Sequence, residues 1–191
     1  LRNAILYGID TRCGPQIQEI NDRIGKEQME EIFGGSCTVE HYGPKILWIR
    51  ENEPDVFRRA KHFTIASGFL TAKLTGEYCV DRYSAKSAVP MLDPRTGNWN
   101  ESFCEGICSP QSLPRVVGTS EVIGTVHPEA AMETGLAEGT PVICGTTDAG
   151  AEAVSIGVVE EGDTMLMYGS TTFFSHLSKT ERNDTGVWVG D

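Results

Sequence analysis

The sequence lacks any apolar run long enough to cross a bilayer, which disfavours an integral membrane protein. It is also short of positive charge, because 16 Lys and Arg stand against 27 Asp and Glu, for a formal net charge of -11. We therefore expect neither nucleic acid nor an anionic membrane surface as a partner of the chain. A bound phosphate would need local hydrogen-bond donors rather than bulk positive charge.

The six cysteines form no Cys-x-x-Cys motif, and no signal peptide precedes them. We expect free thiols in a reducing cytoplasm. Cys104 and Cys108 are the one close pair, and their spacing predicts a shared helical face. No second Cys or His pair nearby completes a zinc site, and the four histidines show no ligand spacing. We therefore expect no metal ligands here, and thiol redox chemistry at this pair is a minor alternative.

The two ends of the chain suggest a piece of a longer protein. The first residue is Leu1 rather than Met, and a strand-like apolar run follows at residues 4–7. The chain stops just after another strand-like run at residues 187–189. A length of 191 residues suits one domain with part of another, and buries roughly two thirds of the unfolded surface.

Residues 15–76 have the pattern of successive helices. Apolar residues at helical spacing predict a helical segment over 15–34, broken at Gly25. Pro44 and Pro54 suit the first turns of the next two helices, and a further helix is expected over 64–74.

From residue 122 onward, strand and helix patterns alternate, which indicates an α/β fold. We expect strands at 122–126 and, buried, at 141–144, with helices at 128–135 and 148–157. Residues 165–168 and 172–177 are predicted to pair as a hairpin. The intervening residues 77–99 are expected to be irregular.

One carboxylate, Asp148, follows an apolar strand and a Gly-Thr-Thr, and precedes a helix. Open α/β sheets bind ligands beyond the carboxyl ends of their strands, so a general base is one interpretation. The other is a helix N-cap, which stabilises a helix by ~1 kcal/mol and is the commoner role for Asp at this position. The two roles are compatible, because a capping carboxylate can still face a cleft.

The turn of the predicted hairpin carries Gly169, Ser170 and Thr171. Glycine lets backbone amides approach a ligand, and successive amides and hydroxyls can cradle an anion. A plain hairpin turn is the alternative. An acid near one turn and a phosphate cradle in the next provide what phosphoryl transfer to a hydroxyl needs.

Five segments, in the right order and at the right spacings, resemble the FGGY carbohydrate kinases, a family that includes xylulokinase, glycerol kinase and ribulokinase. They are NAILYGIDTR, GPKILWIRENEPDVFRRAKHF, LTAKLTGEYCVDRYSAKSAVPMLDPRTGNW, GTPVICGTTDAGAEAVSIG and MLMYGSTTFF. The resemblance implies an actin-like, ribonuclease-H-like α/β fold of two domains, with sugar and ATP meeting in the cleft. It implies the latter part of the N-terminal domain over residues 1–157 and the start of the C-terminal domain over residues 158–191.

The resemblance also implies roles for single residues. Asp148 falls on the general base that deprotonates the sugar hydroxyl, and the turn at 169–171 falls on the loop that approaches the nucleotide phosphates. Asp10 and Arg12 fall on a motif near the sugar pocket, where the forked guanidinium suits polyol oxygens. A surface ion pair is the alternative for these two residues. Asp81 falls on an aspartate that lies near the sugar pocket or supports it.

The implied activity is transfer of the ATP γ-phosphate, with Mg²⁺, to a hydroxyl of a ketose or polyol by a xylulokinase-like enzyme. Motifs for magnesium and adenosine are expected upstream of Leu1 and downstream of Asp191, so this piece alone should be inactive. Departures from the family pattern at Gly8, Ala149 and residues 82–86 lie on the sugar side. A non-catalytic sugar- or nucleotide-binding protein with an actin-like fold, or an interaction module, are the alternatives. Oligomeric state, including a homodimer, is left open.

Overall fold

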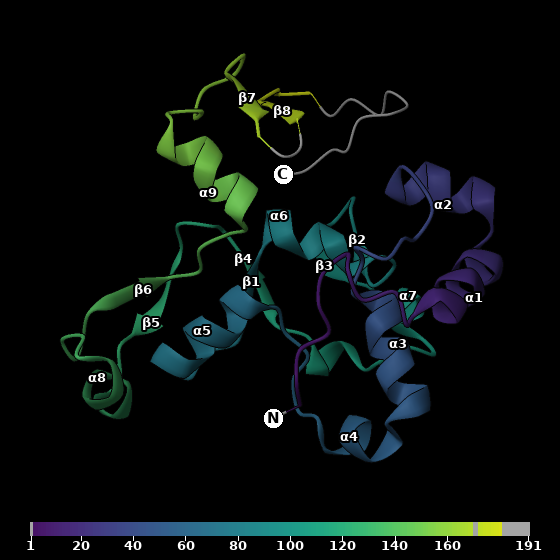
Figure 1. The fold of residues 1–191 in the computed structure, drawn as a ribbon, viewed down its shortest axis with the longest axis horizontal. Helices are drawn as coiled ribbons and strands as arrows, with labels where there is room; N and C mark the ends of the chain where they lie inside the picture. The colour runs from purple at the N-terminus through teal and green to yellow at the C-terminus, as the bar shows by residue number, and fades with distance from the viewer. Residues whose placement is uncertain (1, 170–171, 181–191) are drawn as a thin grey trace.

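The computed structural model describes residues 2–169 and 172–180 (Figure 1). Its N-terminal part is helical, as predicted. The helices are α1 (Gly14–Ile24), α2 (Lys26–Phe33), α3 (Gly43–Asn52), α4 (Pro54–Arg59) and α5 (Ala66–Thr75). The predicted break falls at Gly25, whose φ of 89° suits glycine and ends α1. Proline occupies the first turn of both α3 and α4, also as predicted.

The middle of the chain is more regular than the sequence predicts. It contains the elements β1 (Cys79–Asp81), α6 (Arg82–Ala85), the 3₁₀ turn η1 (Lys86–Ala88), β2 (Leu92–Asp93), β3 (Asn98–Trp99), α7 (Glu101–Cys104), the 3₁₀ turn η2 (Pro110–Ser112) and β4 (Arg115–Val117). Each is two to four residues long. The expectation of irregular chain over 77–99 is therefore wrong, since elements this short show no sequence periodicity.

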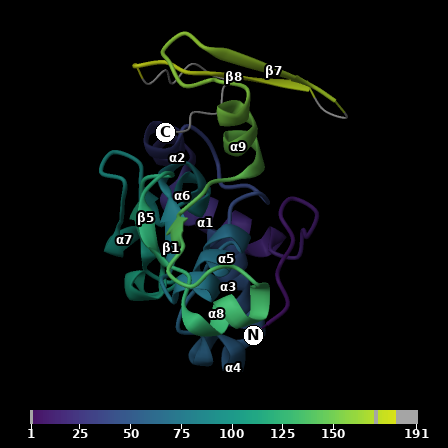
Figure 2. The ribbon, with the colours of Figure 1, turned by 90° about the vertical axis from the view of Figure 1, so that its left-hand side faces the viewer.

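The C-terminal part alternates strand and helix as predicted, through β5 (Val122–Thr125), α8 (Pro128–Thr134), β6 (Pro141–Ile143), α9 (Asp148–Ser155), β7 (Thr164–Tyr168) and β8 (Thr172–His176). β1 pairs with β4 in parallel, whereas β5–β6 and β7–β8 are antiparallel. Within the described ranges, each sheet has two strands. Figures 1 and 2 show α9 and the β7–β8 hairpin at one end of the molecule, beyond the remaining elements.

Three clusters of buried side chains hold these elements together. The largest gathers around Ile20, Met91 and Ile107, all fully buried, and joins the N-terminal helices to β1, η1 and the segment before β4. A second joins β1 and β4 to β5 and the residue after β6 through Cys79, Val117, Ile123 and Cys144. A third joins the β7–β8 hairpin to α9 through Ala153, Val158 and Met165. The segment that carries Asp148 thus begins at the second cluster.

Three local predictions are wrong. Residues 4–7 form no strand; they lie beside α3, where the buried Lys45 ammonium donates to the Leu6 carbonyl oxygen at 2.9 Å. The strand at 141–144 is not buried, since Ile143 is 50% exposed and only Cys144 faces the core. Cys104 and Cys108 do not share a helical face, because α7 ends at Cys104. No helix in the described part of the chain has the length and apolarity needed to cross a membrane.

Candidate functional site

A cavity of about 2190 Å³ lies between the N-terminal segment, the residues before and within α3, and the loop that enters α9. Thr146, Thr147 and Asp148 line it from the α9 side, and Tyr7 and Tyr83 line it as well. Its size exceeds the roughly 300–1,000 Å³ of a typical small-ligand pocket. The carboxylate singled out in the sequence therefore lies on the wall of a space that can take more than one small molecule.

Asp148 is exposed and is the first residue of α9. Its Oδ1 accepts a hydrogen bond from the Ala149 backbone N–H at 2.8 Å. The N-cap position belongs to Thr147, whose backbone is extended and whose side chain makes no capping hydrogen bond. The interpretation of Asp148 as the N-cap is therefore wrong, and the carboxylate remains open to a ligand at the positive end of an eight-residue helix.

Two phenols lie within electrostatic reach of Asp148. Tyr7 is largely exposed, and its partial desolvation raises its pKa, which the negative charges of Glu40 and Asp148 raise further. Burial also raises the pKa of Tyr83, again with a contribution from the Asp148 charge. Both phenols thus stay protonated at neutral pH beside the carboxylate.

The loop before Asp148 is held on two sides. The Cys144 N–H donates to the Glu121 carbonyl oxygen at 3.1 Å, and the Gly145 N–H donates to the Thr119 carbonyl oxygen at 3.0 Å. On the other side, the Thr146 hydroxyl donates to Asp81 Oδ2 at 2.9 Å. Gly145 has a φ of 75°, which lets the chain turn from β6 toward α9.

Asp81, predicted near the sugar pocket, is 1% exposed and does not border the cavity. It is the N-cap of α6, where its carboxylate accepts from the Ser84 N–H at 3.1 Å and from the Ser84 hydroxyl. With Thr146 as a third donor, the buried carboxylate is well satisfied. Asp81 therefore contacts the loop that carries Asp148 rather than the cavity itself.

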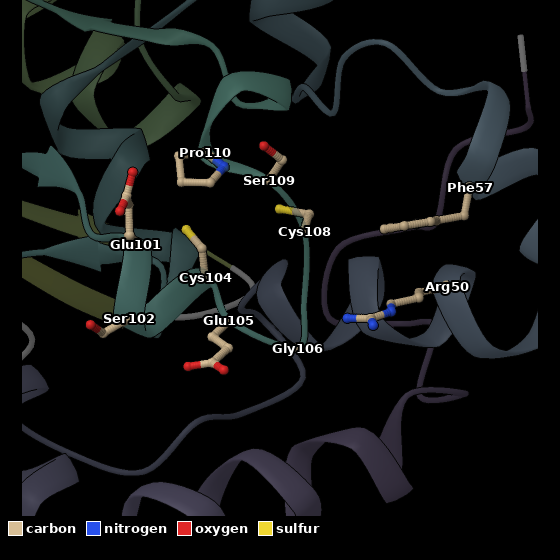
Figure 3. Close-up of a pocket in the computed structure, with 10 residues that line it drawn as sticks. All are labelled: Arg50, Phe57, Glu101, Ser102, Cys104, Glu105, Gly106, Cys108, Ser109 and Pro110. Atoms are coloured by element: carbon tan, nitrogen blue, oxygen red, sulfur yellow. The ribbon is translucent and has the colours of Figure 1, made fainter.

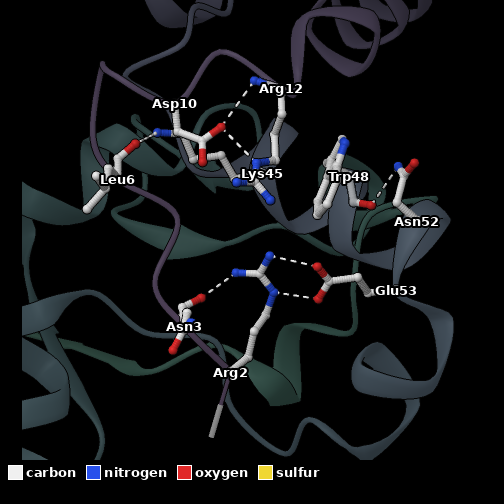
Figure 4. Close-up of polar contacts among 9 residues, drawn as sticks. All are labelled: Arg2, Asn3, Leu6, Asp10, Arg12, Lys45, Trp48, Asn52 and Glu53. Atoms are coloured by element: carbon white, nitrogen blue, oxygen red, sulfur yellow. Dashed lines mark hydrogen bonds and ion pairs between the residues drawn. The ribbon is translucent and has the colours of Figure 1, made fainter.

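Asp10 and Arg12 form an ion pair outside the cavity (Figure 4). Arg12 donates to Asp10 Oδ1 from Nε at 2.8 Å and from its backbone N–H at 3.2 Å. The hydrogen bond from Arg12 holds the pKa of Asp10 below its usual value. The Arg12 guanidinium also lies 4.7 Å from the Trp48 ring centroid, a cation–π contact. The structure brings these two residues together, but neither of them borders the cavity that Asp148 lines.

Sequence reasoning missed a polar group on the wall of the cavity, formed by Thr38, Glu40 and His41. His41 Nδ1 accepts from the Thr38 N–H at 2.9 Å, and the Thr38 hydroxyl donates to Glu40 Oε2 at 2.6 Å. Burial lowers the pKa of His41, although the Glu40 charge opposes this. His41 is far from Asp148 in the sequence and no motif surrounds it, so the sequence carries no signal that it borders the same cavity.

The predicted phosphate turn is only partly described. Gly169 is exposed at the end of β7 and does not border the cavity, and Ser170 and Thr171 lie outside the described residues. The flanking hairpin is confirmed, with Tyr168 paired to Thr172. Over residues 2–169 and 172–180, no group of three or more His, Cys, Asp or Glu could hold a metal ion.

A second pocket, of about 600 Å³, lies between α7, the loop after it, and Arg50 and Phe57 of α3 and α4 (Figure 3). Cys104 and Cys108 line it, but both are buried. Burial raises the pKa of Cys104 to about 12 and that of Cys108 to about 11. Since the thiolate is the reactive form, the pocket offers no support for thiol redox chemistry.

Comparison with known proteins places this chain in a family. Residues 1–155 match the FGGY family of carbohydrate kinases, N-terminal domain. The xylulose kinase of Bacillus subtilis strain 168 is 28% identical over 188 residues, which are 97% of this chain and 37% of that protein. The autoinducer-2 kinase of Enterobacter sp. strain 638 is 32% identical over 167 residues, which are 85% of this chain and 31% of that protein.

Solved structures agree. The crystal structure of xylulose kinase from Rhodospirillum rubrum has a TM-score of 0.84 at 30% identity, over 92% of this chain and 36% of that chain. Plasmodium falciparum glycerol kinase with ADP shares the fold, with a TM-score of 0.75 at 20% identity, over 86% of this chain and 33% of that one. The chain spans about a third of the length of the curated relatives it matches.

Proposed function

Because the chain belongs to the FGGY family of carbohydrate kinases, we propose that it is the central part of an ATP-dependent sugar kinase with Asp148 as the general base. The observation that carries this proposal is the exposed Asp148 carboxylate at the start of α9, on the wall of a large cavity. An acid sealed in the core could not meet a substrate. Residues 1–157 then belong to the N-terminal domain, and residues 158–191 begin the C-terminal domain.

In the proposed reaction, Asp148 accepts the proton of a substrate hydroxyl as that oxygen attacks the γ-phosphorus of ATP. A new P–O bond forms to the sugar, the bond from the γ-phosphorus to the β–γ bridging oxygen breaks, and ADP leaves. Mg²⁺ would supply charge neutralisation, and the described residues of this chain provide no ligand cluster for it. Gly169 with Ser170 and Thr171 are our candidates for holding the phosphates.

We propose a ketose or polyol as the substrate, in a xylulokinase-like reaction. Support comes from relatives named xylulose kinase and autoinducer-2 kinase at about 30% identity, which both lie within this family. Asp10 and Arg12 are candidate substrate-binding residues on the strength of the resemblance alone, since both lie off the cavity. We propose that Asp81 supports the sugar site indirectly, by accepting the hydrogen bond from Thr146.

The experiment is a screen of the full-length protein for ATP consumption that depends on an added sugar, over a panel of ketoses and polyols. We expect turnover with at least one ketose or polyol, and formation of its phosphate ester. Absence of any sugar-dependent ADP formation, with a protein that unfolds cooperatively, would remove the kinase proposal.

The second candidate is a sugar-binding protein of the same fold without catalysis. Ala149 favours it, because this methyl-bearing residue borders the cavity at the place where many family members carry an amide. This candidate predicts that a sugar raises the melting temperature while ADP formation stays at the sugar-free rate. The kinase proposal predicts both effects from the same sugar.

A further inference from the structure

We propose that Thr146 is a positioning residue, which fixes the loop that carries Asp148 by donating a hydrogen bond to the buried Asp81. This inference rests on the proposed function, since it assigns to Asp148 a geometry that matters for proton transfer. Thr146 and Asp81 are 65 residues apart, and the bond between Thr146 Oγ1 and Asp81 Oδ2 is 2.9 Å long.

The Asp81–Thr146 hydrogen bond is one of two side-chain contacts between β1 and the loop at residues 144–146. Cys79 and Asp81 are two residues apart on β1, so their side chains lie on the same face of the strand. Cys79 contacts Cys144, and Asp81 contacts Thr146, and these two partners are also two residues apart. The Cys79 and Cys144 sulfurs are both buried and lie 3.3 Å apart. The Asp81–Thr146 hydrogen bond is the next contact along the chain toward Asp148.

The Thr146 side chain also packs against the first turn of α9, at Gly150. A Cβ at Gly150 would lie 2.9 Å from both Cγ2 and Oγ1 of Thr146, too close for either atom to stay in place. Gly150 therefore leaves room for the Thr146 side chain in the rotamer that reaches Asp81. Because Thr is β-branched, it cannot turn one of these atoms away without moving the other.

The anchor at the other end is rigid. Asp81 is 1% exposed, caps α6, and holds the Ser84 N–H and hydroxyl as well as Thr146. Thr146, two residues before Asp148, thus ties the loop that carries Asp148 to a buried carboxylate that also accepts from Ser84. The loop has two further anchors, at the Thr119 and Glu121 carbonyl oxygens, but both act on Cys144 and Gly145 rather than on Thr146 itself.

The test uses Thr146→Val, Thr146→Ser and Gly150→Ala in the full-length protein. Val keeps the shape of Thr and removes the donor, whereas Ser keeps the donor. Ala at 150 leaves Thr146 and Asp81 in the sequence but displaces the Thr146 side chain; Gly150 itself does not border the cavity. We expect kcat to fall about tenfold to a hundredfold in the first and third variants, as for a small misplacement of a reacting group, with KM changed less than threefold.

Thr146→Ser should restore kcat to within about threefold of wild type, and rescue by Ser alone separates the hydrogen bond from general packing. Thr125→Val, at an exposed position of β5, is the matched control and should leave kcat unchanged. Wild-type kcat in Thr146→Val and Gly150→Ala would overturn the proposal.

A second readout does not depend on activity. Amide hydrogen exchange at Cys144 and Gly145, whose N–H groups donate to the Glu121 and Thr119 carbonyl oxygens, should speed up at least tenfold in Thr146→Val and Gly150→Ala, and match wild type in Thr146→Ser. Unchanged exchange in both would overturn the proposal even if no sugar substrate is found. Conversely, if the wild type has no kinase activity and the variants still show this exchange pattern, the proposed function is contradicted while the role of Thr146 in fixing the loop is supported.

Discussion

At the scale of single residues, Asp148 and Asp81 differ in role because they differ in exposure. Asp148 is exposed at the start of α9, where a carboxylate can meet a hydroxyl. Asp81 is buried, with three hydrogen bonds from Ser84 and Thr146, where it can only hold neighbouring segments. The sequence motif around each gives no hint of this difference, which follows from the fold.

His41 provides a pH-dependent prediction. Burial lowers the pKa of His41 below its usual value of 6.5, so the unfolded chain takes up a proton at higher pH than the native protein. Stability is therefore full above the unfolded pKa and is lost as pH falls through the folded pKa. We expect the melting temperature to drop between pH 7.5 and pH 5.5.

His41→Asn is the variant that tests this, because its amide oxygen can still accept from the Thr38 N–H and cannot titrate in this range. Its melting temperature should drop less than that of the wild type over the same interval. Equal drops in the two proteins would show that His41 is not the titrating group.

At the scale of elements, the start of α3 depends on close contact with the chain before β2. A Cβ at Gly43 would overlap the carbonyl oxygen of Val89 and lie 3.1 Å from its carbonyl carbon. Backbone cannot move aside as a flexible side chain would. We expect Gly43→Ala to destabilise the protein by about 1–3 kcal/mol, as overpacking does.

Gly14→Ala is the matched control, because Gly14 is also the first residue of its helix and an added Cβ meets nothing within 4 Å. Intrinsic helix propensity favours Ala over Gly by up to about 1 kcal/mol at either position. Chemical unfolding should thus separate the two variants. Equal stability of Gly43→Ala and Gly14→Ala would refute the packing argument.

The longer helices were predictable from the sequence because proline and glycine mark their ends. Pro44 and Pro54 lie in first turns, and Gly25 separates α1 from α2. The C-terminal strands and helices, and the β7–β8 hairpin, were predictable from alternating patterns. The parallel β1–β4 pair was not, because it joins three-residue strands whose paired residues are 36 apart in the chain.

The candidate site was predictable only where a local motif marks it. Asp148 was found because a strand, a Gly-Thr-Thr and a helix surround it. Its place after the N-cap was missed, since sequence cannot tell which of Thr147 and Asp148 takes the extended backbone. The Asp81–Thr146 hydrogen bond, and the place of Thr38, Glu40 and His41 on the cavity wall, were missed because they depend on contacts between distant segments.

At the scale of the whole molecule, one end carries much exposed apolar surface. Ile156 of the chain after α9 is 64% exposed, and Leu166 and Phe174 of the hairpin are 68% and 62% exposed. Among the described residues at this end, Ala153, Val158 and Met165 form the buried cluster. By contrast, all six cysteines are buried in the main body or against it.

This burial predicts that the thiols are unreactive in the native protein. Burial raises the pKa of Cys37 and Cys104 to about 12, so little thiolate exists at pH 8. We expect iodoacetamide at pH 8 to leave all six unmodified over minutes, and to modify all six after unfolding in guanidinium chloride. Peptide-level mass spectrometry reads each site, and rapid native labelling of any of the six would contradict the buried arrangement.

The most direct test of the account is the turnover number of Asp148→Asn in the full-length protein, with the sugar that the wild type phosphorylates. Asn keeps the size of the side chain and cannot accept a proton, and Glu152→Gln changes an exposed acid on the same helix as a control. We predict a loss of about 10²–10⁴-fold in kcat for Asp148→Asn, the range of a general base, and none for Glu152→Gln. A loss of less than about tenfold in Asp148→Asn would contradict the assignment of Asp148 as the base.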